Sequence, residues 1–212
     1  MSTLDFIYRR RSVRKFKADP VPEDDIRELL KAATWAPSGK NLQNWHFVVI
    51  TDARKIAEIA RLVEDKNAKL AEYLTDEAKI KTFRGSVPYH TVFKGAPALI
   101  LIYASPYETI ADLLTEAGIL PQAEALRYGR PNPGIQNIAA ATENFLLAAA
   151  SLGYGTCWMT GPTYAAEEIS ACIGFAKPGF HLAAMTPLGI PAESAGANPP
   201  RKPLDEVVTF IR

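Results

Sequence analysis

The chain has 212 residues, enough for one domain with a core of ordinary size. Hydrophobic residues make up 48% and charged residues 22%, and the net charge of +1 gives no global reason to expect a nucleic-acid or membrane partner. Apolar runs fall short of the roughly 20 residues that cross a bilayer, and charges arrive too early for a signal peptide. We therefore expect a cytoplasmic, single-domain protein.

The first elements are predicted from apolar periodicity and capping residues. Residues 2–9 are expected to form a short helix. Pro22 followed by three acids predicts the start of a second helix, which Pro37 ends. The apolar run at 45–51 predicts a strand, and a charged segment with one apolar face predicts a helix over 53–74.

The middle of the chain is less regular. Residues 75–95 show a mixed pattern and are expected to be irregular. Residues 98–103 are apolar on both faces, as a central strand should be. Residues 105–133 contain four prolines and no sustained period, which predicts an excursion with short helices. An excursion of this length is usually functional or mobile.

The last third alternates again between helix and strand patterns. Residues 134–152 are apolar around much of their circumference, which predicts a central helix that Gly153 ends. The remaining predicted elements are a short strand from 155 that leads into a Gly-Pro turn, a helix over 163–173, a strand over 181–189 and a segment of strand character at 207–211.

The titratable residues give little support for metal or thiol chemistry. Cys157 and Cys172 form no CxxC pair, so reduced, buried thiols are predicted. His46, His90 and His181 are isolated from one another and from clustered carboxylates, so no metal site is predicted. A P-loop, a GxSxG elbow and a complete dinucleotide fingerprint are all absent from the sequence.

Two basic segments could bind an anion. Residues 9–17 carry six cations in nine positions. A solvated face and a nucleic-acid contact are open alternatives, but Arg10, Ser12 and Arg14 would share one face if Val13 and Phe16 point inward, and arginine forks suit phosphate oxygens. In the tail, Arg201 stands among prolines, either in a surface linker or on a rigid arm.

Four motifs in this order resemble the FMN-dependent nitroreductase family: Arg-Arg-Ser-Val-Arg-Lys-Phe near the start, Pro-x-x-x-Asn-x-Gln-x-Trp-His-Phe at 37–47, Gly-x-Gly-x-Cys-Trp-Met-Thr-Gly-Pro at 153–162 and Pro-Arg-Lys-Pro-Leu-Asp-Glu-Val-Val at 200–208. The resemblance implies an α+β fold in which helices wrap a mixed central sheet, with residues 1–212 in one domain. It also implies a homodimer with two FMN sites at the subunit interface. Residues 191–212 would form a C-terminal arm whose strand crosses to the partner.

The resemblance also implies a set of FMN contacts. Arg10, Arg11, Ser12 and Arg14 match the positions that hold the phosphate and the pyrimidine side of the ring, and Arg201 matches a second phosphate ligand. The segment that reaches the flavin from the other subunit matches Pro37, Ser38 and Gly39. Asn41 matches a ring contact, and Thr160 with Gly161 matches the turn whose backbone N–H groups approach the flavin N5 region.

The implied activity is a ping-pong cycle in which NADH or NADPH reduces FMN, which then reduces a small nitroaromatic or quinone-like acceptor. No side chain is required as an acid or base, so no catalytic residue is predicted. The alternatives are the same fold with reductive dehalogenation, substrate dehydrogenation or flavin breakdown, or a non-catalytic protein that binds flavin or nucleic acid.

Departures from the family pattern bear on the acceptor. Asn44 stands where well-known nitroreductases often have proline, and Thr160 where they often have an acidic residue. We expect Asn44 to be the first place to look for a difference in substrate. Candidate lids over the flavin, with core packing or loop anchoring as the alternative, are Phe83, Tyr89, Phe93, Tyr107 and Tyr128.

Overall fold

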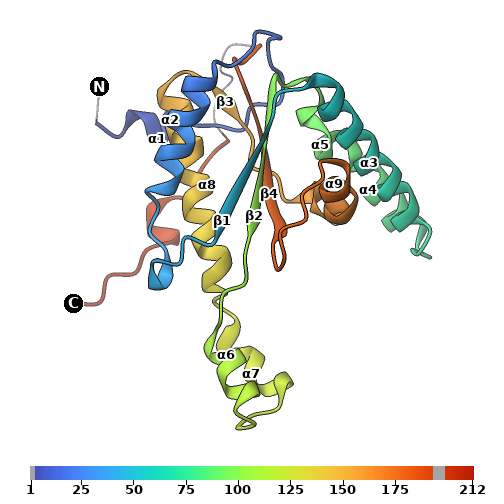
Figure 1. Cartoon of the computed structure of the whole chain (residues 1–212). Coiled ribbons are helices and arrows are strands. Elements are labelled where there is room, and N and C mark those ends of the chain that lie inside the picture. Colours follow the sequence, from blue (N-terminus) through green and yellow to red (C-terminus); the bar gives the residue numbers. More distant parts are fainter. Residues whose placement is uncertain (1–2, 193–198) are drawn as a thin grey trace.

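The fold is a four-stranded sheet between two groups of helices, as the computed structural model in Figure 1 shows; it describes residues 3–192 and 199–212. The strands are β1 (Trp45–Ile50), β2 (Ala98–Ala104), β3 (Gly155–Thr156) and β4 (His181–Gly189), in the order β1-β2-β4-β3. All three neighbouring pairs are antiparallel. The predicted α+β class is confirmed.

The central strand β2 is buried along its whole length. Ile100 and Ile102 face one apolar cluster, and Leu99, Leu101 and Tyr103 face the other. A strand that is apolar on both faces needs a cover on each side, because either face left in water would expose a continuous apolar surface. The two helical layers supply these covers.

The first layer consists of α1 (Asp5–Arg9), α2 (Glu23–Thr34) and α8 (Pro133–Ser151) (Figure 1). Helix α2 buries Ile26, Leu29 and Ala33, which recur on one face of the helix. Helix α8 is the central helix that its composition predicted, with Phe145 and Ala149 fully buried against the sheet.

The second layer consists of α3 (Ala53–Ala71), α4 (Glu77–Gly85), α5 (Val87–His90) and α9 (Ala166–Cys172), with the 3-10 turns η2 (Val92–Gly95) and η3 (Gly161–Ala165). The prediction that 75–95 is irregular was wrong. Asp76 caps α4 by accepting from the backbone N–H of Lys79, and the helices that follow are only four residues each. Elements this short leave no readable period.

The excursion between β2 and α8 contains short helices, as predicted. Helices α6 (Ile110–Glu116) and α7 (Gln122–Gly129) form a hairpin that projects beyond the end of the sheet (Figure 1). Thr109 and Asp112 form a reciprocal capping box at its start.

The C-terminal tail makes one 3-10 turn, η4 (Leu204–Glu206), and is exposed from residue 199 to the end. The segment of strand character at 207–211 forms no strand within this chain, and Phe210 and Ile211 are 73% and 96% exposed. Its exchange with a partner stays a prediction. Residues 193–198 of the predicted arm lie outside the described residues.

The basic N-terminal segment lies along the outer edge of the sheet. The backbone N–H of Val13 donates to the carbonyl of Thr156 in β3 over 2.7 Å, and Ser12 and Thr156 form a parallel bridge. Among the described residues, this bridge is the only parallel pairing, so the predicted mixed character of the sheet is confined to it. The side chain of Val13 is buried, which turns its neighbours outward.

Gly155 is required at this edge because of packing. A Cβ at residue 155 would lie 2.7 Å from three side-chain carbons of Val13. We predict that Gly155→Ala lowers the free energy of unfolding by about 1–3 kcal/mol, the usual cost of overpacking, as measured by urea denaturation. Gly95→Ala, where a Cβ meets nothing within 4 Å, is the control. The double variant Val13→Ala/Gly155→Ala should recover part of the loss, and no recovery would contradict the packing explanation.

Candidate functional site

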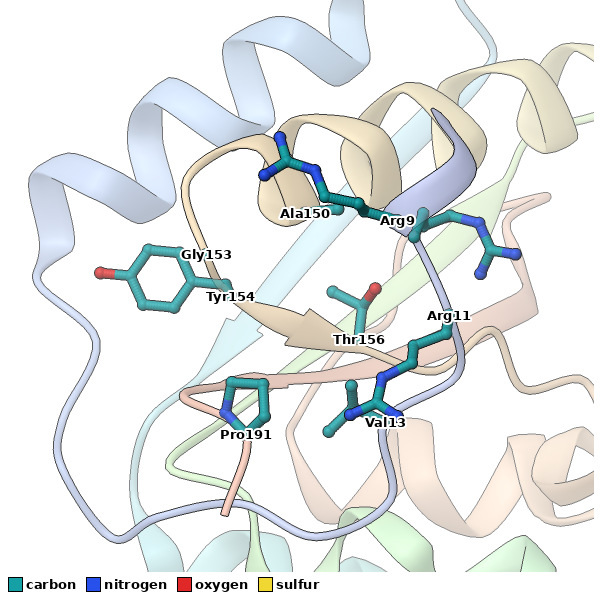
Figure 2. Close-up of a pocket in the computed structure, with 9 residues that line it drawn as sticks. Arg9, Arg11, Val13, Ala150, Gly153, Tyr154, Thr156 and Pro191 are labelled. Atoms are coloured by element: carbon teal, nitrogen blue, oxygen red, sulfur yellow. The ribbon is translucent and has the colours of Figure 1, made fainter. Parts of the chain in front are cut away.

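A cationic pocket of about 320 Å³ opens between the basic segment and the end of α8 (Figure 2). Its described lining includes Arg9, Arg10 and Arg11, together with Tyr154 and Thr156, and holds no acidic side chain. Guanidinium groups gathered without a carboxylate in the lining favour an anion, above all a phosphate or carboxylate, whose oxygens accept from the planar guanidinium fork.

The other predicted residues of this segment surround Cys157. Burial raises the pKa of the Cys157 thiol. The positive charges of Arg14 and Arg10 and a hydrogen bond from Ser12 lower this pKa. Arg10, Ser12 and Arg14 therefore all favour the charged form of the Cys157 thiol. Arg10 also approaches α8, where its Nε lies 3.6 Å from Oε1 of Glu143.

The turn at Thr160–Gly161 follows three residues after Cys157 and lies beside the middle of β4, because Met159 pairs with Met185. Met159 holds it in place by exchanging two backbone hydrogen bonds of 2.9 Å with Met185 in β4. The carbonyl of Thr160 accepts from the backbone N–H and the hydroxyl of Thr163, which starts η3. Thr160 is exposed and Gly161 is half-buried, so a ligand can reach the turn.

The segment 37–41 forms a strained turn that includes η1 (Gly39–Asn41). Lys40, Asn41 and Gln43 have φ angles of +58°, +49° and +47°, which is uncommon for residues with a side chain. The backbone N–H of Gln43 donates to the Ser38 hydroxyl, and the Gln43 side chain donates to the side-chain Oδ1 of Asn41. These bonds hold the left-handed conformation in place.

Two buried amides tie this turn to the rest of the molecule. Asn137 in α8 accepts from the backbone N–H of Gly39 over 3.0 Å and donates to the Asn44 side chain over 2.8 Å. Asn44 in turn donates to the carbonyls of Ser105 and Gly134. The expectation that Asn44 selects substrate is thus corrected, because its side chain is 3% exposed and its amide is committed to the backbone.

Two groups of predicted residues contact α8 at different positions. Pro37, Ser38, Gly39 and Asn41 sit beside its first turns through the Asn137 contact, whereas β3 and the arginines flank its C-terminal half (Figure 1). Glu143 and Ala150 lie about 9 Å and 20 Å beyond Asn137 along the axis, at 1.5 Å per residue. The 37–41 turn and the arginines therefore do not share one contact point on α8. Arg201 is exposed and donates locally to the carbonyl of Pro199.

The candidate lids separate into two groups. Phe93 is fully buried in the core. Tyr107 packs so closely against Gly39 and Gly134 that a Cβ at either glycine would clash with it. Both aromatic residues therefore have a structural role. Phe83 packs against Tyr164 with ring centroids 6.0 Å apart, while Tyr89 and Tyr128 remain exposed.

Sequence reasoning missed three residues that shape this region: Asn137, Glu143 and His90. The signal for the first two was a polar side chain in an otherwise apolar helix. His90, in contrast, gave no signal, because its contact with Gly161 joins segments that are far apart in the chain. Within the described ranges, no group of three or more histidine, cysteine, aspartate or glutamate side chains could hold a metal, and no helix is long and apolar enough to span a membrane.

Comparison with known proteins gives a consistent result. A family model described as the nitroreductase family matches residues 7–190. The crystal structure of a BluB-like flavoprotein from Clostridium difficile 630 is similar with a TM-score of 0.92 and 39% identity, covering 100% of both chains. An NADH dehydrogenase from Thermus thermophilus is 29% identical over 95% of this chain and 92% of its own. An iodotyrosine deiodinase from Nematostella vectensis is 28% identical over 95% of this chain and 72% of its own.

The amide network makes a quantitative prediction. Asn137→Ala removes the acceptor of the Gly39 N–H and the donor to Asn44, and leaves a half-buried N–H and a buried amide oxygen without these partners. We expect a loss of about 2–4 kcal/mol in the free energy of unfolding, at about 1–3 kcal/mol for each buried orphan, measured by urea denaturation.

The matched control is Asn144→Ala on the same helix, whose amide makes one 3.3 Å bond to the carbonyl of Ala32. It should cost about 1 kcal/mol or less. Equal losses for the two variants would show that the network has no special role.

Proposed function

Because the chain belongs to the nitroreductase family, we propose that it is an FMN-dependent oxidoreductase in which NADH or NADPH reduces FMN, and FMN reduces a small nitroaromatic or quinone-like acceptor. The observation that carries the proposal is the cationic pocket lined by Arg9, Arg10 and Arg11, on the segment that also carries Ser12 and Arg14, with an exposed turn at Thr160–Gly161.

The residues present fit FMN at both of its ends. A phosphate monoester is a compact dianion, and arginines with a hydroxyl form the donor set that suits its oxygens. The isoalloxazine ring needs backbone donors rather than charged contacts along most of its edge, and the accessible turn at Thr160–Gly161 can provide them. The similar structure with 39% identity is a flavoprotein.

Bound FMN would supply the redox chemistry, since it accepts two electrons as a hydride and passes them on. The chain's own residues would bind and tune it. Arg10 and Ser12 would hold the phosphate, Arg14 would place a positive charge near the pyrimidine side of the ring, and Thr160 with Gly161 would orient the N5 edge. A cation near N1 stabilises the negative charge of reduced flavin.

We further propose that the working form is a homodimer. An apolar groove of about 650 Å³ lies between α1, α2 and α8 and is lined in part by Phe6, Trp35 and Leu147, with Trp35 80% exposed. Exposed apolar surface of this kind marks an interaction site. A second copy seated on this layer is the source we propose for the Pro37, Ser38, Gly39 and Asn41 contacts.

A second candidate reaction is reductive dehalogenation, which the iodotyrosine deiodinase relative favours. It would use the same cofactor and the same arginines, so the acceptor decides between the two. The excursion at α6–α7 supplies exposed apolar side chains such as Ile110 and Leu126 near the strained turn, on the side where an acceptor pocket would be completed.

The test is an anaerobic stopped-flow experiment on the FMN-loaded protein. NADH or NADPH should bleach the flavin absorbance, and a second mixing with a nitroaromatic, a quinone or an iodinated tyrosine should restore it at a rate that identifies the acceptor. Protein that retains no FMN, or FMN that neither nucleotide reduces, would contradict the proposal. Fast reoxidation by the iodinated tyrosine alone would select dehalogenation.

Arg201 provides a specific prediction about the tail. If the arm reaches the phosphate, Arg201→Ala should weaken FMN binding by about 1.5–3 kcal/mol, the scale of a charge-assisted hydrogen bond, measured by fluorescence titration of FMN into the apoprotein. Lys202→Ala, the neighbouring cation, is the control and should bind FMN normally. Equal affinity of the Arg201 variant and the wild type would remove the tail from the site.

A further inference from the structure

His90, at the end of α5, packs directly against the Thr160–Gly161 turn. A Cβ at residue 161 would lie 2.5 Å from Nε2 of His90, so the imidazole occupies the space that any other side chain would need. Gly161 does not have the positive φ that would by itself require glycine. The glycine is therefore required because of His90.

The hydrogen bonds around His90 determine which nitrogen carries its proton. Nδ1 lies 3.3 Å from the hydroxyl of Tyr164 and 3.4 Å from that of Ser86. Both hydroxyls have donated elsewhere, Tyr164 to the carbonyl of Val63 and Ser86 to that of Phe83. Each oxygen can then only accept, so Nδ1 is the donor and Nε2 keeps a free lone pair. That lone pair is on the side of Gly161.

The surroundings of His90 favour the neutral form of the ring. Burial lowers its pKa below the ordinary histidine value. The groups packed around it come from the α4–α5 region and η3, and the titratable one among them is Tyr164, whose own pKa is raised by burial. No carboxylate in the described part of the chain contributes to the pKa of His90 to offset the burial.

We propose that His90 is a positioning residue for the ligand bound at the Thr160–Gly161 turn: the neutral imidazole fixes the turn, and a proton taken up at Nε2 places a positive charge beside it. The inference rests on the proposed function, which puts the flavin ring at this turn. A charge there favours the reduced cofactor, because reduced flavin is negative. The reduction potential should therefore rise more steeply with falling pH once His90 begins to protonate.

The first experiment needs no turnover. Long-range ¹H–¹⁵N spectra of the full-length apoprotein should show His90 as the Nδ1–H tautomer with a pKa below that of a free histidine. Addition of FMN should shift the His90 resonances and leave those of His46 in place. His46 is the matched control, because its pKa is also lowered, first by burial and then by Lys177, but its ring packs against Phe175 and Phe180.

The second experiment measures the reduction potential of bound FMN against pH for the wild type, His90→Phe and His46→Phe. The phenyl ring keeps the contact with Gly161 but cannot take up a proton. We expect a bend in the wild-type plot at the pKa of His90, the same bend in His46→Phe and none in His90→Phe. A bend that persists in His90→Phe, or an Nε2–H tautomer in the apoprotein, would overturn the inference.

The two proposals fail in distinguishable ways. If all three proteins bind FMN and NADH or NADPH bleaches it, the oxidoreductase assignment stands whatever the potential of His90→Phe shows. If FMN binds without moving the His90 resonances, the inference about His90 falls alone. A wild-type protein that binds no FMN overturns both.

Discussion

The burial of β2 on both faces is the constraint from which the rest of the structure follows. Its seven residues are buried, so hydrophobic burial stabilises the fold only if a layer of helices covers each face of the sheet. Helices α2 and α8 cover one face, and α3 and α9 cover the other. With both faces covered, accessible backbone is left along the edge of the sheet: the basic segment runs beside β3, and the exposed Thr160 turn follows the pairing of Met159 with β4.

The elements that the sequence predicted correctly are those with a regular burial pattern. The periodicity of α2 follows from one buried face, and the unbroken apolar run of β2 follows from burial on both faces. The segment 75–95 was misinterpreted because α4, α5 and η2 are too short for a period to accumulate. The left-handed conformation at Lys40 and Gln43 could not be predicted, because neither position is a glycine.

The site was predictable to a different extent from the fold. The motif around Arg10, Ser12 and Arg14 could be read locally, because three residues on one extended segment share a face by alternation alone. The contact of Asn44 with Asn137 could not, since it joins residues 93 positions apart. Without that contact in view, the unusual Asn44 looked like a specificity residue. It is in fact the group that allows a strained turn to be held next to a buried helix end.

The homodimer that we propose would bring the strained turn of one subunit to the arginines of the other. Within one chain Asn137 holds the turn, whereas the arginines lie near Glu143 and Ala150, about 9–20 Å further along the axis of α8. A two-fold axis perpendicular to α8 and close to its middle would set two copies of the helix antiparallel, so that the first turn of each lies near the last turn of the other. This two-fold rotation would bring the strained turn of each subunit to the arginines of the other and would form two equivalent sites. The amide network that fixes Gly39 to α8 would then fix, with the same rigidity, a residue that serves the other subunit. Strain that is costly within one chain would thus be retained because it completes a site in its partner.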